Sequence, residues 1–318
     1  VGVGQLTLIG PYPQAQDRTC IAGQTCAFQD ITGAHLQDGD RFMALETCGS
    51  ATPLAGFAWS GSAHAVVSSG GAVDWGTVAN TAGGGSYRLC WCAGGAVCGV
   101  PGDFAVDAGG LLLIGPVHKD TRLVPRTQAG ATLTLREPVR GSLPQVRECV
   151  AGQVCQIDDL LGQYISADDT FAILDTCGLG KALVAQWPND GRPEMVTRWG
   201  RSAVWNRPES LQEHKLNSVS MRFQTPVTAA GGLYRICWCA RDMRCTTSES
   251  MIVDVGELHL HGPALEQTRT CLSSQECWLD DFVGYRLNTS DRLMVLDTCA
   301  SAGALDPLSI PRWPLGGS

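Results

Sequence analysis

The segment YRLCWCAGGAVC at residues 87–98 is repeated as YRICWCARDMRC at residues 234–245. In both copies the tyrosine, the aliphatic residue and the tryptophan share one face of an alternating pattern, and the arginine and two cysteines share the other. A period of two is typical of a β-strand, so we expect the aromatic face to lie in a hydrophobic core. The segment therefore predicts a β domain that occurs twice in the chain.

A longer block precedes each of these segments and also occurs a third time. The block has the spacing Cys-x5-Cys-x21-Cys in every copy, and it begins at residues 20, 149 and 271. A third block closes the first two copies as VDAGGLLLIGP (106–116) and VDVGELHLHGP (253–263), and the similar VGVGQLTLIGP opens the chain. Blocks in a fixed order at a long period indicate a repeat architecture. We therefore divide the chain into an N-terminal strand (1–11), unit one (12–110), unit two with insertions (111–256) and an incomplete unit three (257–318).

The residues between the blocks favour an all-β fold. The chain contains 38 glycines in 318 residues, and Gly, Thr or Ser interrupts every candidate helix. Short strands separated by turn residues are typical of β-sandwiches, so we expect tandem immunoglobulin-like β-sandwich repeats stapled by disulfides. We expect less than about a fifth helix, with one helical turn or a short helix in LDDFVGYRL (279–287). The insertions of unit two, near 118–141 and 198–215, belong in surface loops.

The chain has 15 cysteines in a fixed order, which indicates a disulfide framework formed in an oxidising compartment. Six cysteines in a unit allow about 15 pairings, and the sequence alone does not choose among them. Locality and the strand faces favour the pairs Cys20–Cys26, Cys48–Cys90, Cys92–Cys98, Cys149–Cys155, Cys177–Cys237, Cys239–Cys245 and Cys271–Cys277. Cys299 is then left without a partner in its unit, either free or available to bridge to another chain.

Metal binding is the alternative use of the repeated polar residues. A Cys-x-Cys pair with a third cysteine suits zinc or copper, but the chain has no Cys-x2-Cys pair, and we favour disulfides. His259 and His261 lie on one strand face, yet the aligned positions of the other copies are not histidine, so we interpret them as exposed or semi-exposed strand residues. Three sets of acidic residues repeat, and they either bind calcium or form turns, which is the interpretation that we favour. These sets are Asp30, Asp159 and Asp281; Asp40, Asp169 and Asp291; and Glu46, Asp175 and Asp297.

Other functional classes leave no signal in the sequence. The six histidines are scattered, and no nucleophile elbow, metalloprotease motif or phosphate loop occurs, so we predict no enzyme, no cofactor and no catalytic or metal-binding residues. The net charge of −8 without a basic cluster argues against nucleic acid, and no apolar run approaches the roughly 20 residues that insert into a membrane. Glycans are expected partners, because Asn288 begins the only Asn-x-Ser/Thr sequon. The Ser-, Ala- and Gly-rich loop at 60–86 is either O-glycosylated or simply flexible.

The YRLCWC segment followed by a VDxGxLxLxGP strand resembles cysteine-rich repeats of very large secreted surface or flagellar-hair (mastigoneme-like) proteins of unicellular eukaryotes. The resemblance covers both complete units and the partial third. It implies a secreted, extracellular scaffold that often carries glycans, and it transfers no catalytic residue.

We therefore expect a secreted structural protein that assembles head to tail with itself into a filament or surface layer. The alternative is an extracellular adhesin or carbohydrate-binding module that uses the loops of unit two. The N-terminal strand is a candidate donor strand for the incomplete unit three of the next chain. Its polymer interface comprises Val1, Val3, Leu6 and Leu8. The other interpretation is that the chain is a window of a longer repeat array.

Overall fold

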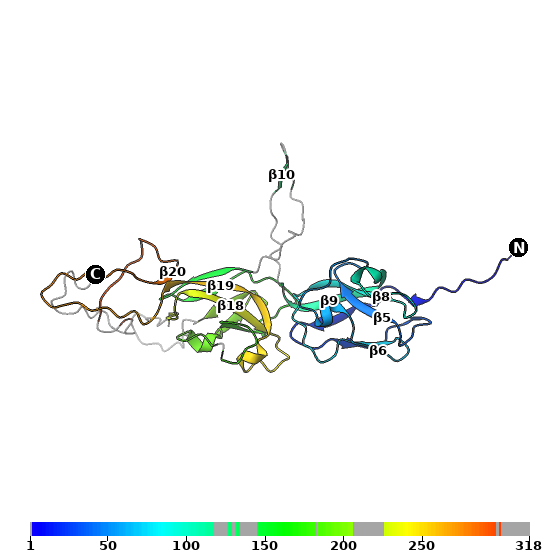
Figure 1. The fold of residues 1–318 in the computed structure, drawn as a ribbon. Coiled ribbons are helices and arrows are strands. Elements are labelled where there is room, and N and C mark those ends of the chain that lie inside the picture. Colours follow the sequence, from blue (N-terminus) through cyan, green and yellow to red (C-terminus); the bar gives the residue numbers. More distant parts are fainter. Residues whose placement is uncertain are drawn as a thin grey trace, which may run out of the picture.

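The computed structural model describes residues 2–117, 145–181, 183–205, 226–296 and 299, and the backbone of a short hairpin. The hairpin consists of β10 (Arg126–Gln128) and β11 (Ala131–Leu133). Figure 1 shows units one and two in a row, with the N-terminal segment and unit three at opposite ends. The described residues contain no α-helix but only four 3-10 turns, η1 (Ala58–Gly61), η2 (Pro101–Asp103), η3 (Pro188–Gly191) and η4 (Ser248–Ser250). Consequently, no helix in this part of the chain is long and apolar enough to span a membrane.

Unit one is a sandwich of two β-sheets. The first sheet has the order β2 (Arg18–Ile21), β9 (Val106–Pro116), β8 (Gly85–Cys92) and β5 (Arg41–Leu45). In this sheet β2 runs parallel to β9, and the other pairs are antiparallel. The second sheet is antiparallel and has the order β3 (Ala27–Phe28), β7 (Ala72–Asp74) and β6 (Ala65–Val67). In chain order these sheets match the C-F-G and B-E-D strands of an immunoglobulin sandwich, with the first strand added beside G.

Unit two repeats this arrangement strand for strand. Its first sheet has the order β12 (Arg147–Val150), β19 (Val253–Pro263), β18 (Gly232–Cys239) and β15 (Thr170–Leu174). Its second sheet has the order β13 (Cys155–Ile157), β17 (Ser202–Trp205) and β16 (Met195–Thr197). As in unit one, the first strand of the unit (β12) is parallel to its last, closing strand (β19). The prediction of tandem immunoglobulin-like sandwiches with little helix is therefore confirmed.

The two faces of β8 lie in two different apolar clusters. Leu89 and Trp91 are buried in the main core between the sheets, as the alternation predicts. Cys90 and Cys92 lie in a smaller cluster on the outer face of the sheet, where Phe104 covers them. The strand is thus covered on both sides, which explains why its neighbour β5 is apolar on both faces.

A tyrosine fixes the start of β8 and of β18. The Tyr87 hydroxyl donates a hydrogen bond of 2.6 Å to the Gly83 carbonyl, and the Tyr234 hydroxyl donates one of 2.7 Å to the Ala230 carbonyl. Burial, helped by the negative charge of Glu46, raises the pKa of Tyr87 to about 12. A hydroxyl that bonds to backbone four residues upstream at this corner is the tyrosine corner of immunoglobulin-like domains.

The structure joins the cysteines in the seven pairs favoured above. Three bridges lie in each complete unit and one, Cys271–Cys277, lies in unit three. Cys299 is free and exposed. Each complete unit therefore has one bridge between its halves and two bridges that close short loops.

Three expectations about local structure need correction. The segment 279–287 forms no helix but contains β20 (Gly284–Tyr285), because Asp281 and Arg286 adopt left-handed backbone angles that end a helix. The unit boundaries at 110/111 and 256/257 fall inside β9 and β19.

The third correction concerns the second insertion of unit two. Trp205 is buried, and its indole donates to the Gly191 carbonyl, just as that of Trp75 donates to the Gly61 carbonyl. The stretch from Cys177 to Trp205 has nearly the same length as its counterpart in unit one, so the extra residues follow Trp205. They lie outside the described residues, as does most of the insertion at 118–141.

Candidate functional site: the junctions between repeat units

Each closing strand ends in the next unit. Most of β9 belongs to the first sheet of unit one, but its last two residues pair with β14 (Gly162–Gln163) of unit two. The last two residues of β19 pair in the same way with β20 of unit three. At the N-terminal side, β1 (Gly10–Pro11) pairs with β4 (Gly33–Ala34) of unit one. Neighbouring units are therefore connected by a continuous strand.

The glycine of the first two Gly-Pro ends allows the strand to approach a tryptophan of the next unit. A Cβ atom on Gly115 would lie 3.4 Å from the ring of Trp238 and 2.9 Å from the side chain of Ala22. In the same manner, a Cβ atom on Gly10 would lie 3.3 Å from the ring of Trp91. Both glycines have a φ near +140°, which residues with a Cβ rarely adopt. The tryptophan of the YRxCWC strand thus has a second role, as the platform on which the preceding closing strand ends.

A glutamine holds each junction, and it is buried at the first two. The side-chain oxygen of Gln145 accepts a hydrogen bond from the Leu161 N–H at 2.8 Å. Its side-chain nitrogen donates to the Leu161 carbonyl at 3.0 Å and to the Val117 carbonyl, just after β9, at 2.7 Å. Gln145 is fully buried, so these bonds satisfy backbone groups of two units away from water.

The same clamp occurs at the other two junctions. Gln16 binds both backbone polar groups of Thr32, and Gln267 binds both those of Val283 together with the Ala264 carbonyl. The sequence reasoning missed this residue because it began each block at the first cysteine. The signal is the repeated Gln-x-Arg-x-Cys at 16–20, 145–149 and 267–271.

The first two sets of repeated acidic residues lie in turns. Asp30, Asp159 and Asp281 have φ of 62°, 56° and 55°. Their carbonyls accept hydrogen bonds from the arginines of the Gln-x-Arg-x-Cys motifs. The carboxylates of the second set accept a hydrogen bond from the backbone N–H three residues earlier, in Asp40, Asp169 and Asp291. Burial raises the pKa of Asp169. Of the third set, Asp297 lies outside the described residues.

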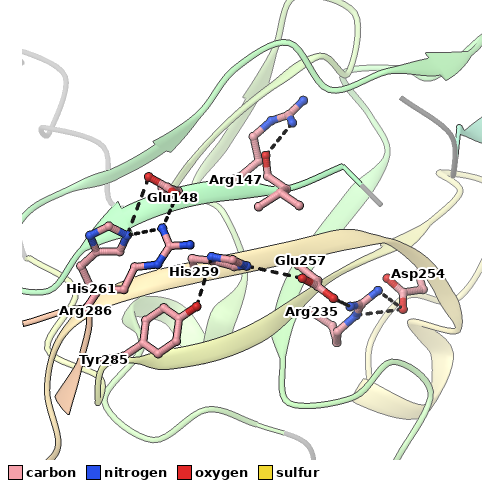
Figure 2. A network of polar contacts seen from close by, with 10 residues as sticks. Arg147, Glu148, Arg235, Asp254, Glu257, His259, His261, Tyr285 and Arg286 are labelled. Carbon is pink, nitrogen blue, oxygen red and sulfur yellow. Dashed lines mark hydrogen bonds and ion pairs between the residues drawn. The ribbon is translucent and has the colours of Figure 1, made fainter. Parts of the chain in front are cut away.

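The junction of units two and three carries a polar network, shown in Figure 2. On β19, the His259 ring lies 3.4 Å from the Glu257 carboxylate through Nε2 and 3.3 Å from the Tyr285 hydroxyl through Nδ1. Glu257 also forms an ion pair of 3.0 Å with Arg235, which pairs with Asp254 at 2.7 Å. The network therefore extends from the sheet of unit two to β20 of unit three.

A second branch of the network ties Arg286 to unit two. The Arg286 guanidinium forms an ion pair with Glu148 of β12 and lies 3.2 Å from Nε2 of His261. The hydrogen bond from Arg286 lowers the pKa of the Glu148 carboxyl. At the junction of units one and two, the residues aligned with His259 and His261 are Leu112 and Ile114. The histidines are thus semi-exposed strand residues, as expected, but they also take part in a contact between units.

The N-terminal segment lies apart from the sandwiches (Figure 1). Leu6 and Leu8 are 94% and 85% exposed, whereas the aligned residues of β9, Leu111 and Leu113, are 0% exposed. Burying a leucine contributes about 1.5–3 kcal/mol, so the segment retains a substantial driving force for docking. Val3 is exposed as well, and Val1 lies outside the described residues.

Unit three exposes residues that are core residues elsewhere. Leu293 is 59% exposed, whereas the aligned Phe42 and Phe171 are 0% exposed. Between residues 264 and 296 the structure forms one strand, β20, and the segment aligned with β2 and β12, Arg269–Leu272, forms none. Asn288 is exposed in this unit, in a turn where its side chain accepts a hydrogen bond from the Ser290 N–H.

No protein-family model and no curated protein matches the chain. Among solved structures, it is similar to the Bacteroides ovatus mixed-linkage glucan utilization locus protein SGBP-B in complex with a heptasaccharide, with 10% identity, a TM-score of 0.20, and coverage of 81% of this chain and 46% of that chain. It is also similar to immunoglobulin domains 1–4 of Sidekick-1, with 11% identity, a TM-score of 0.18, and coverage of 80% and 52%. The chain spans about half the length of these two proteins. With TM-scores this low, the fold assignment rests on the strand order described above.

Proposed function

We propose that the chain is a secreted structural scaffold whose units form a stiff row and extend head to tail into a filament or surface layer. The observation that carries the proposal is the continuous strand at both internal junctions. A unit connected by a flexible linker would reorient freely, whereas a shared strand and a buried clamp fix its orientation.

The disulfide framework supports an extracellular location for this scaffold. Seven bridges among the described residues persist only in an oxidising compartment. The resemblance of the YRxCWC segment to repeats of large secreted surface and flagellar-hair proteins agrees with the same role. A scaffold also needs no catalytic centre, which fits our expectation that the chain is not an enzyme.

Electron microscopy of the chain secreted from a eukaryotic host tests the proposal. We expect single molecules in which units one and two have one fixed relative orientation, and strings of such molecules at higher concentration. Small-angle scattering of the same sample measures the orientation in solution. Molecules whose two units adopt many angles, or that remain single at every concentration, would contradict the scaffold.

A second candidate function rests on one hairpin of unit two. Trp199 lies at the tip between β16 and β17 and is 84% exposed, whereas unit one has Ser69 at this position. Arg198 and Trp199 adopt left-handed backbone angles, with φ of 51° and 58°, as Ser68 and Ser69 do in the same hairpin turn of unit one, so the substitution places an indole at a turn that both units share. An exposed indole ring suits stacking against a sugar ring, so we propose an adhesin or carbohydrate-binding role as the alternative. Glycan-array binding that Trp199→Ser abolishes supports this alternative, and an array without signal refutes it.

A further inference from the structure

We propose that unit one carries a carbohydrate-binding site, in which the open face of Trp59 stacks against a sugar ring of a neutral polysaccharide. Trp59 lies in η1, on the connection between β5 and β6. The inference rests on the carbohydrate-binding role given above as the second candidate function. It assigns that role a site in a different unit from the hairpin of Trp199.

The turn that holds Trp59 occurs in both units, but its residues differ. Trp59 and Ser60 adopt left-handed backbone angles, with φ of 52° and 56°. The aligned Asn189 and Asp190 of η3 do the same, with φ of 50° and 53°. Asn and Asp tolerate this conformation because their short polar side chains bond locally, whereas a bulky side chain is strained there. Unit one thus has a tryptophan where unit two has a residue suited to the turn, and strain of this kind points to function.

Three contacts fix the Trp59 ring at the surface. Its indole N–H donates a hydrogen bond of 3.0 Å to the Trp75 carbonyl. The His64 ring stacks on it, with ring centroids 5.5 Å apart and an angle of 17° between the planes. Gly76 lies at the edge of the pair, where a Cβ atom would be 3.4 Å from the His64 ring and 3.6 Å from Nε1 of Trp59. The indole is therefore held in one orientation without a ligand, which lowers the entropic cost of binding one.

One face of the indole remains open. His64 covers one side of the ring, and Trp59 is nevertheless 55% exposed. The face of an aromatic ring is electron-rich, so it attracts the C–H groups that line one side of a pyranose ring. Quaternary ammonium ligands are typically bound instead in cages of several aromatic rings. A single open face therefore favours a sugar ring over a cation.

A carboxylate beside the stack supplies an acceptor for sugar hydroxyls. The backbone carbonyl of Asp74 accepts a hydrogen bond of 2.8 Å from the His64 N–H, and its side-chain Oδ1 accepts one of 2.7 Å from the Gly76 N–H. Within the described ranges Oδ2 has no hydrogen-bond partner, so it is available to a hydroxyl. This negative charge, together with the net charge of −8, disfavours acidic sugars, so we assign the site to a neutral polysaccharide.

The fold itself does not require this cluster of side chains. The backbone is the same in both units, since the His64 N–H bonds to the Asp74 carbonyl as the Glu194 N–H bonds to the Val204 carbonyl. The side chains differ at all three positions of the cluster. Unit two has Asn189, Glu194 and Val204 where unit one has Trp59, His64 and Asp74. The aromatic pair and its carboxylate are therefore additions of unit one to a shared scaffold.

A glycan array of neutral and acidic oligosaccharides tests the full chain, and isothermal titration calorimetry then measures the affinity for the neutral oligosaccharide with the strongest signal. Trp59→Asn installs the residue of unit two, which suits the left-handed turn. We expect this variant to bind about tenfold more weakly or worse, because the stacked face is lost. The matched control is Ser60→Asn, which places the same residue at the neighbouring left-handed position and keeps the indole. It should bind as the wild type does.

NMR of the wild-type chain provides a measurement that does not depend on a folded variant. The Trp59 indole N–H is bonded within the stack, so its signal should shift as the oligosaccharide is added. An unchanged signal, equal binding by Trp59→Asn and the wild type, or binding of acidic glycans alone overturns the proposed site. If Trp199→Ser removes the binding and Trp59→Asn does not, the carbohydrate-binding role stands and only this site is wrong. If the wild-type chain binds no glycan, the role and the site both fail.

Discussion

Replacing Gln145 with leucine is expected to destabilise unit two by about 2–4 kcal/mol. Gln145 is fully buried, and its side chain makes three hydrogen bonds to backbone groups, the N–H and carbonyl of Leu161 and the carbonyl of Val117. Leucine has a similar size but no polar atoms, so these backbone groups lose their partners without a large cavity. Each lost hydrogen bond costs about 0.5–1.5 kcal/mol, and an unsatisfied buried group costs up to about 3 kcal/mol.

Urea unfolding followed by tryptophan fluorescence measures this loss, because Trp187, Trp205 and Trp238 are all buried in unit two. The matched control is Gln267→Leu, which removes a clamp with the same bonds from the more exposed unit three. Water can replace those bonds, so we expect the control to lose less than about 1 kcal/mol. Equal effects of the two substitutions, or a change below about 0.5 kcal/mol for Gln145→Leu, would refute the idea that the buried amide holds the junction.

Three further outcomes are expected. Replacing both cysteines of the Cys48–Cys90 bridge, which has a sequence separation of 42, by alanine should lower the free energy of unfolding in urea by about 4 kcal/mol. Removing one of the bridges that close short loops should lower it by about 2 kcal/mol. Because the pKa of Glu148 is lowered when folded, its contact with Arg286 should persist above the ordinary carboxyl pKa and be lost as pH falls through the lowered value. Carboxyl NMR titration checks this, and an unchanged Glu148 pKa in Arg286→Gln would contradict the ion pair. A chain secreted from an N-glycosylating host should carry a glycan at Asn288, visible as a mass increase that Asn288→Gln removes.

The parts of the fold that depend on short-range patterns could be predicted from the sequence. The alternation in the YRxCWC segment identified the face that enters the core, because a strand has only two faces. The same alternation, together with locality, favoured the bridge Cys48–Cys90, since Cys90 lies on the outer face opposite Leu89 and Trp91. Because the same blocks occur in both complete units, the strands expected in one unit could be compared with those expected in the other.

The junctions could not be predicted in this way, because they depend on contacts between residues distant in the sequence. Nothing in the alternation of β9 indicates that Gly115 leaves its own unit and contacts Trp238. The role of Gln145 was missed because a single polar residue before a cysteine is unremarkable until the backbone groups around it are known. The histidines of β19 were interpreted one strand at a time, whereas their partner Arg286 lies in another unit.

The continuity of β9 also determines how the row responds to a pulling force. A stretch applied along the row loads β9 along its length within unit one and loads its two-residue pairing with β14 of unit two. The strand is held by parallel pairing to β2 along four residues and by antiparallel pairing to β8 along seven. Antiparallel hydrogen bonds lie perpendicular to the strand, so a pull along it loads them together in shear instead of opening them one after another. Release of β9 from unit one therefore requires the collective rupture of a whole ladder.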